Sequence, residues 1–197
     1  MTKTQLLDEL IKKNHGYLLT SLTEKHRISR TYMMSYVKEH GMEKVAQGIY
    51  VTDDVWPDEL FILQAKSPSV IFSGETALYL HGLIDREYTE ISITVPVGYN
   101  ATRLKSVNVR VKYVPKEIHN LGVCEVPSSS GNMVKVYDQE RCICELIKDR
   151  KNIEVQNFQT AVKNYMASKE KNLSRLMKHA EKLKIRDEIM KYVEVLV

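Results

Sequence analysis

The chain has 197 residues, is 43% hydrophobic and carries a formal net charge of +4, which suits a globular protein with one substantial core and a smaller second one. No stretch reaches the roughly 18 consecutive apolar residues of a membrane-spanning helix, and no basic-then-apolar secretion signal is present, so we expect a cytoplasmic protein with no membrane partner. The three cysteines lack the paired C-x-x-C spacing of a zinc site, and we expect reduced thiols, no metal and no cofactor.

The first fifty residues predict three short helices and a hairpin. Apolar residues at helical spacing in "TKTQLLDELIKKNHG" indicate a helix that is capped by Thr4 and ends at Gly16. A brief helix follows within "TSLTEKH", and Ser29 is a good N-cap for a third helix. Gly48, followed by "IYV", indicates the return strand of a hairpin. We expect these elements to form a small domain at residues 1–54.

The second region begins after the acidic segment "DDVWPDELF", which we interpret as a linker leading into a helix near Asp58. Alternation with period two in "EISITVPVG", "SVNVRVKYVP", "GVCEVP" and "MVKVYD" predicts strands of a mixed or antiparallel sheet. From Asp138 onward the pattern is helical. We therefore predict an α+β protein whose larger domain, residues 58–197, has a small sheet and a helical C-terminal half.

The third predicted helix has two different sides. Met33, Tyr36, Val37 and His40 recur at spacings of three and four, so we expect them to face the core. The opposite side is polar, with arginines at its N-terminal end. A second helix that follows a tight turn and presents its N-terminal half outward fits the major groove of B-DNA. The side chains expected to contact DNA here are Arg27, Ser29, Arg30, Thr31, Tyr32, Ser35 and Lys38.

The chemistry of these side chains suggests separate roles. Arg30 is expected to donate two hydrogen bonds to a guanine, and Ser35 is expected to be a short partner for a base edge. Lys38 is expected to neutralise a phosphate, as is Lys44 on the hairpin, where Gln47 lies near the tip and the hairpin would act as the wing of a winged helix-turn-helix. Two alternatives remain open from the pattern alone: an ordinary solvated helix face, and a module that docks a protein.

Charge is unevenly distributed along the chain. Residues 1–50 contain eight basic and five acidic side chains, residues 53–90 contain two basic and eight acidic ones, and residues 150–197 contain eleven basic and six acidic ones. Both ends are therefore cationic. The basic C-terminal helices suggest further contacts to DNA phosphates through Lys178, Lys182 and Lys184, with a solvated helix surface as the competing interpretation.

The order of segments across the chain resembles a known family. "GYLLTSLTEKHRISRTYMMSYVKEHGMEKVAQGIYV" resembles the winged helix-turn-helix that opens the AbiEi-like antitoxins of abortive-infection E systems. "SGETALYLHGLID", "EISITVPVG" and the helical ending from "VYDQERCICELIKDR" to "YVEVL" are similar to the second domain of the same family. The resemblance therefore covers nearly the whole chain.

The resemblance implies a transcriptional autorepressor that is also an antitoxin. In this family the first domain binds inverted repeats in double-stranded DNA upstream of its own operon, and the second domain opposes a toxin with a nucleotidyltransferase fold. The arrangement is type IV, a phage-defence system in which antitoxin and toxin need not form a stable complex. Since no coiled coil or exposed apolar stripe is evident, we expect a monomer in solution that pairs on DNA.

Catalysis is the main rival class of function. Glu75, His81 and Asp85 are close in sequence, and Cys142 and Cys144 form a C-x-C pair, but neither set has the spacing of a known catalytic motif. We expect His81 to be a capping or packing residue at a helix end. The sequence therefore predicts that the chain is not an enzyme.

Overall fold

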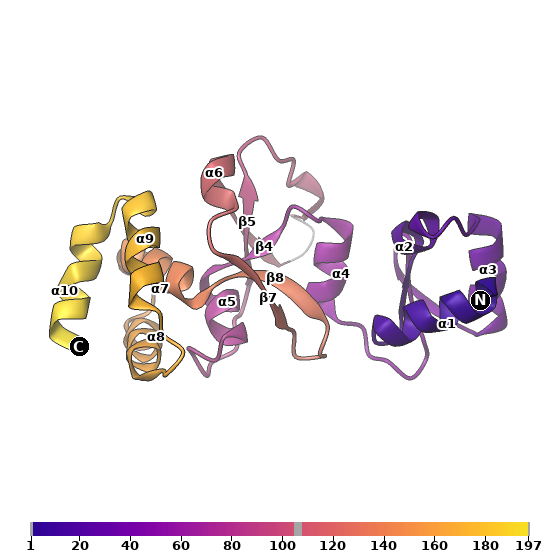
Figure 1. Cartoon of the computed structure of the whole chain (residues 1–197), viewed down its shortest axis with the longest axis horizontal. Helices are drawn as coiled ribbons and strands as arrows, with labels where there is room; N and C mark the ends of the chain where they lie inside the picture. The colour runs from indigo at the N-terminus through magenta and orange to yellow at the C-terminus, as the bar shows by residue number, and fades with distance from the viewer. Residues whose placement is uncertain (1, 105–107, 197) are drawn as a thin grey trace. The chain divides into compact units, whose positions relative to one another are not determined.

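The computed structural model describes residues 2–104 and 108–196 and divides into two compact units (Figure 1). The first unit contains the chain as far as Pro68 together with residues 127–133, and the second contains residues 69–126 and the chain from Val134 onward. The predicted boundary between residues 54 and 58 falls inside the first unit, and the division into functional domains stays a prediction. The expected α+β class is confirmed.

The first unit combines four helices with a small antiparallel sheet. Strand β3 lies at the centre, between β1 and β2, and pairs antiparallel with both. The order along the chain is α1 (Lys3–Lys13), β1 (Tyr17–Leu19), α2 (Thr20–Lys25), α3 (Arg30–Glu39), β2 (Glu43–Ala46), β3 (Ile49–Val51) and α4 (Glu59–Lys66).

Two local expectations for this unit are wrong. Helix α1 is capped by Thr2 and not by Thr4, because the Thr2 hydroxyl accepts from the Gln5 amide while the Gln5 side chain accepts from the Thr2 amide. Strand β1 is absent from the sequence-based scheme. Its three residues follow Gly16 directly and owe their extended conformation to pairing with β3, which local pattern cannot reveal.

The second unit is built on a five-stranded mixed sheet in the order β6-β5-β4-β8-β7. Strand β5 runs parallel to β6 and antiparallel to β4, and β4 runs parallel to β8. The strands are β4 (Ile71–Phe72), β5 (Ile91–Pro96), β6 (Val109–Val114), β7 (Val123–Pro127) and β8 (Met133–Tyr137). The helices among and after them are α5 (Gly74–Leu80), α6 (Lys116–His119), α7 (Gln139–Lys148), α8 (Val155–Ala167), α9 (Leu173–Leu183) and α10 (Arg186–Leu196).

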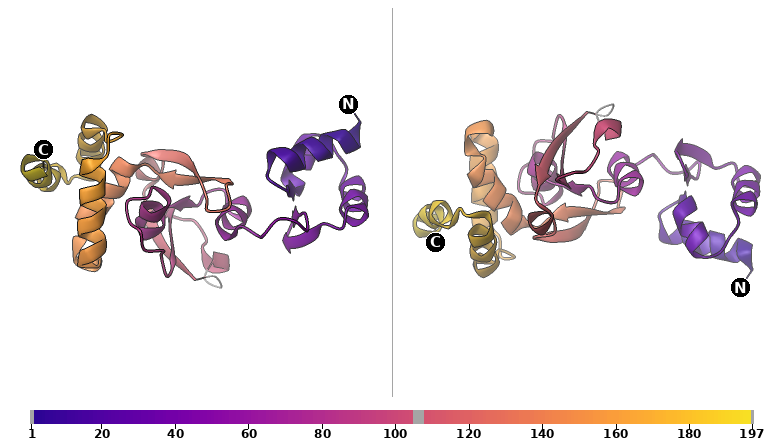
Figure 2. Two further views of the ribbon diagram at one scale, coloured as in Figure 1. Left: turned by 90° about the horizontal axis from the view of Figure 1, so that it is seen from below. Right: turned by 90° about the horizontal axis from the view of Figure 1, so that it is seen from above.

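Helix α7 connects the sheet to the C-terminal helices. It packs against α5 on one side and against α8, α9 and α10 on others, and Figure 2 shows α7 between the strands and α9, with α10 beyond α9. Eight of its ten residues are buried, including Cys142 and Cys144, whose thiols donate to the carbonyls of Tyr137 and Leu176. Burial raises the pKa of both thiols. These thiols therefore stay protonated and unreactive at neutral pH.

A buried carboxylate ties the turn between β7 and β8 into the first unit. Asp58 caps α4 by accepting from the Phe61 amide, and its other oxygen accepts from the Ser128 hydroxyl at 2.5 Å and the Asn132 amide at 2.8 Å. The backbone N–H of Asp58 donates to the Tyr17 hydroxyl at 2.6 Å. One side chain thus joins the start of α4 to a turn seventy residues later.

The helices of residues 2–104 and 108–196 are all too short or too polar to cross a bilayer.

Candidate nucleic-acid interface

Helix α3 is positioned by a tight turn after α2. Arg27 adopts a left-handed backbone conformation at φ 56°, and its N–H donates to the Glu24 carbonyl, which reverses the chain within a few residues. Buried Ile28 then anchors the turn. The predicted N-cap is confirmed, since the Ser29 hydroxyl accepts from the Tyr32 amide at 3.3 Å.

The inward side of α3 is part of the core of the first unit. Met33, Tyr36 and Val37 are buried, as their spacing predicts, and pack with residues of α1, β1 and β3. The Tyr36 hydroxyl donates to Asp8 of α1 at 2.5 Å, and burial together with this carboxylate raises the pKa of the phenol. The prediction for His40 is wrong. This residue is the exposed C-cap of the helix, and its ring stacks on Tyr36 at a centroid distance of 3.8 Å.

The outward side of α3 consists of Arg30, Thr31, Met34, Ser35 and Lys38, all of which are exposed. Among the residues that the structure describes, none forms a hydrogen bond or ion pair with the side chain of Arg30, Thr31, Ser35 or Lys38. Arg27 at the preceding turn is likewise exposed. Met34 is 39% exposed and its sulfur accepts from the Tyr50 hydroxyl. This side therefore presents hydrogen-bond donors and positive charge that the first unit does not itself use.

Tyr32 differs from the other predicted contact residues. It is half-buried, its hydroxyl lies 2.8 Å from the Thr4 hydroxyl, and the Lys3 ammonium lies 5.6 Å from the centre of its ring. Tyr32 therefore fastens α3 to the start of α1. Sequence analysis missed the proximity of Lys3 and Thr4, because no pattern within α1 reports its packing partner.

The predicted hairpin is formed by β2 and β3, with its turn at Gln47 and Gly48. Gly48 has a φ of +73°, and a Cβ there would approach the Thr20 hydroxyl to 3.2 Å, so the turn needs glycine. Lys44 and Gln47 are both exposed, and the Lys44 ammonium reaches the Gln47 side-chain oxygen at 3.5 Å. Both predicted wing residues are thus on one open face of the hairpin.

The three lysines predicted to contact DNA from the second unit lie at the end of α9. Lys178 and Lys182 are exposed and one turn apart on the helix, and Lys184 is an exposed C-cap in a left-handed conformation at φ 58°. Arg175, one turn before Lys178, makes a 3.6 Å ion pair with buried Glu140. The lysines themselves have no such partner among the described residues.

His81 and Glu75, which were considered for catalysis, have structural partners. His81 lies at the end of α5, and one of its ring nitrogens is 2.7 Å from the Tyr137 carbonyl. Burial lowers the pKa of this histidine. Glu75 accepts from the Asn157 amide at 3.1 Å. No cluster of three or more His, Cys, Asp or Glu side chains suited to a metal ion occurs within residues 2–104 and 108–196.

Comparison with known proteins gives a likeness of fold. No protein-family model matches the chain, and no curated protein matches it. The chain is similar to the crystal structure of the RV2827C protein from Mycobacterium tuberculosis, with a TM-score of 0.53 and 11% sequence identity. The match covers 93% of this chain and 75% of that one. At this identity the similarity supports the arrangement of the elements and carries no function.

Proposed function

We propose that the first unit is a winged helix-turn-helix that binds double-stranded DNA and that the chain is a transcriptional autorepressor. One observation carries the proposal: α3 buries Met33, Tyr36 and Val37 while the donors on its outward side have no partner among the described residues. Exposed polar side chains cost little free energy of folding, and these are free to contact a ligand. Their chemistry suits phosphates and base edges.

The arrangement of the neighbouring elements supports the same proposal. Helices α2 and α3 are joined by a tight turn, and the β2–β3 hairpin follows α3 and exposes Lys44 and Gln47. A reading helix in the major groove, with a basic hairpin beside it on the phosphate backbone, needs these parts in this order. Arg30 and Ser35 are assigned to base edges, and Lys38 and Lys44 to phosphates.

A mobility-shift titration tests the proposal directly. The probe is the DNA upstream of the chain's own gene, titrated with the full chain in the presence of excess competitor DNA. The proposal requires a specific complex that an unrelated duplex of equal length does not displace. If the unrelated duplex displaces the probe as readily as unlabelled upstream DNA does, the binding is only non-specific. If no complex forms at all, the DNA-binding assignment is wrong.

The second part of the proposal is an antitoxin role, which the resemblance to AbiEi-like antitoxins supports. The chain would counteract a toxin with a nucleotidyltransferase fold, without a stable complex between them, and the proposal assigns no reaction to the chain itself. Co-expression gives the test. Growth inhibition by a toxin encoded beside this gene should be relieved by the full chain, and unchanged inhibition would refute the antitoxin role while leaving DNA binding unaffected.

The proposal also covers the oligomeric state of the chain on DNA. One winged unit buries little surface on DNA, so two monomers are expected to pair on an inverted repeat. A concentration-independent dimer in sedimentation without DNA would contradict this.

Contact between the second unit and DNA predicts that neutralising Lys178, Lys182 and Lys184 together lowers operator affinity. Unchanged affinity would assign these lysines to solvent.

A protein-docking adaptor is the alternative function. Met34, exposed at the middle of the outward side, is the observation that favours it, because exposed methionines are common on protein-binding surfaces. Absence of any operator complex, together with a protein partner whose binding is lost in Met34→Ala, would replace DNA with protein as the ligand of this surface.

A further inference from the structure

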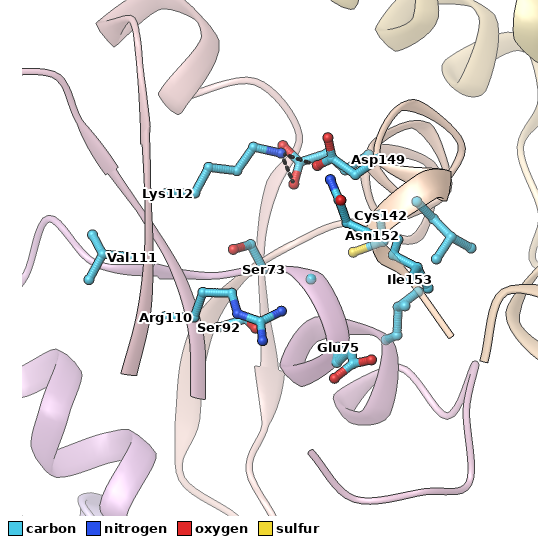
Figure 3. Close-up of a pocket in the computed structure, with 14 residues that line it drawn as sticks. Ser73, Glu75, Ser92, Arg110, Val111, Lys112, Cys142, Asp149, Asn152 and Ile153 are labelled. Carbon is cyan, nitrogen blue, oxygen red and sulfur yellow. Dashed lines mark hydrogen bonds and ion pairs between the residues drawn. The ribbon is translucent and has the colours of Figure 1, made fainter. Parts of the chain in front are cut away.

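The second unit contains a cavity of about 350 Å³ between α5, β5, β6 and α7. Figure 3 shows Arg110 and Lys112 reaching into it from β6, with Ser73 and Ser92 at its floor and Glu75 on α5. This volume lies near the lower end of the range for small-molecule sites. The cavity shares no residue with the surface assigned above to DNA, so the inference drawn from it is independent of the proposed function.

The floor of the cavity is lined by two buried hydroxyl groups. Ser73 is 3% exposed and Ser92 is 8% exposed. Thr94 donates to the Ser73 oxygen at 2.9 Å, which leaves the Ser73 proton free to be donated, and no described residue bonds to the Ser92 hydroxyl. Between them Gly74, at φ +53°, keeps the space clear, since a Cβ would lie 3.1 Å from that of Ser92. Two hydroxyl donors therefore face the cavity.

A guanidinium group stands at the mouth of the cavity. Arg110 uses its Nε to bond Glu90 at 2.9 Å, and its two terminal nitrogens bond to no described residue. Lys112, by contrast, is held by Asp149 at 2.7 Å and by Glu145 at 3.6 Å. The terminal nitrogens of Arg110 and the two serine hydroxyls thus form a set of donors that suits a tetrahedral anion.

Acceptors occupy the opposite side of the cavity. One Glu75 oxygen accepts from Asn157, while its second oxygen has no partner among the described residues. One Asp149 oxygen bonds to Lys112, and its other oxygen also lacks a described partner. Asn152 adds a side-chain amide with no described partner. Carboxylate oxygens placed in this way accept hydrogen bonds from the hydroxyl groups of a ligand.

We propose that this cavity binds a small hydroxylated phosphate monoester, with the phosphate at Arg110, Ser73 and Ser92 and the hydroxyls at Glu75 and Asp149. A sugar phosphate and a nucleoside monophosphate share this chemistry. The remaining wall is apolar and would contact the body of the ligand, through Leu78, Leu146 and Ile153. The ligand would bridge α5, β6 and α7 and stabilise the second unit against unfolding.

Calorimetric titration of the full chain with four probes tests the proposal: ribose 5-phosphate, adenosine monophosphate, adenosine and inorganic phosphate. We expect the phosphorylated sugar, the nucleotide or both to bind, and both adenosine and inorganic phosphate to bind more weakly. Binding of the nucleotide alone would identify the base as part of the ligand. Failure of both phosphate monoesters at millimolar concentration, or equal binding of adenosine and its monophosphate, would overturn the proposal.

Variants locate the site. Arg110→Ala should weaken phosphate monoester binding about tenfold or more, and Ser92→Ala should weaken it severalfold, because each removes a donor to the phosphate. Arg86→Ala is the matched control, since Arg86 is similarly exposed and pairs with Glu154 at the same 2.9 Å distance. Equal losses in Arg110→Ala and Arg86→Ala would indicate charge alone and refute the assignment. Circular dichroism of each variant checks that it is folded.

Discussion

Helices α3 and α7 have ten residues each and begin in the same way, with a side-chain cap from Ser29 in one and Asp138 in the other. Most of their charged residues differ in exposure. Those of α3 are exposed, and Arg30 and Lys38 have no partner among the described residues. In α7, Glu140, Arg141 and Glu145 are all buried. Charge in a helix therefore indicates a binding surface only where the fold leaves the charge unused.

The charges of α7 are used within the second unit. Fully buried Arg141 donates to Glu145 at 2.8 and 3.1 Å and to the Ile118 carbonyl at 3.3 Å, and its guanidinium lies 4.6 Å from the centre of the Tyr137 ring. Glu140 accepts from the Tyr165 hydroxyl and from the backbone N–H of Asn172, the N-cap of α9. These residues hold α7 to its neighbours and leave nothing for a ligand.

The sharpest test of this contrast removes one arginine from each helix. Arg141→Met should lower the free energy of unfolding by about 3–5 kcal/mol, because buried Glu145 loses its principal partner. Arg30→Met should change it by no more than about 0.5 kcal/mol. Denaturant titrations of both variants measure the difference. Similar losses of stability would mean that Arg30 belongs to the architecture of the first unit.

Two adjacent methionines test the two sides of α3. Met33 is fully buried and also accepts from the Thr23 hydroxyl, so Met33→Ala should cost about 2–5 kcal/mol of stability. Met34→Ala should cost less than about 1 kcal/mol. Thermal unfolding of the two variants gives the comparison. A larger loss for Met34→Ala would reverse the assignment of inward and outward sides.

Arg30 also tests the use of the outward side in binding. Arg30→Ala should weaken the operator complex by about 1–3 kcal/mol and reduce the preference for the operator over a mutated site. The preference is measured with wild-type and base-substituted duplexes in parallel, and Arg86→Ala provides a control of the same charge. If Arg30→Ala weakens every duplex equally, Arg30 contacts phosphate and does not read a base.

The smallest effect on DNA binding is expected from a substitution on the hairpin. Lys44→Ala should weaken all duplexes alike and reduce the slope of log affinity against log salt by about one unit, because one phosphate contact is lost. Affinities at several salt concentrations measure this slope. A change in sequence preference in place of a change in slope would place Lys44 in a groove.

What the sequence predicts correctly about α3 depends on features that are local. The spacing of Met33, Tyr36 and Val37 specifies the buried side, and Ser29 specifies the start. One failure depends on where the helix ends and the other on a distant partner. His40 has the right spacing for the core but lies at the helix end, where the chain turns away. The link of Tyr32 to Thr4 joins helices twenty-eight residues apart, which no window along the chain includes.

The burial of the α7 charges and the formation of the cavity also depend on contacts between distant segments, so the sequence predicts neither. A pair such as Arg141 and Glu145, four residues apart, has the usual spacing of a surface ion pair, and only the surrounding helices make it buried. The cavity takes Ser73, Ser92, Arg110 and Asp149 from four separate segments. The sheet order brings these segments together, and sequence analysis predicts strands without their order.

The hydrogen bonds of Asp58 limit where this polypeptide can be divided. The turn at Ser128–Asn132 belongs to the first unit, although the strands on either side of it belong mainly to the second, so the chain crosses between the units three times. A fragment that stops at Pro68 would keep the Asp58 carboxylate but lose Ser128 and Asn132, whose side chains donate to its Oδ2. Excision of the chain as far as Pro68 would therefore yield a less stable protein, because the turn that completes the first unit stays behind.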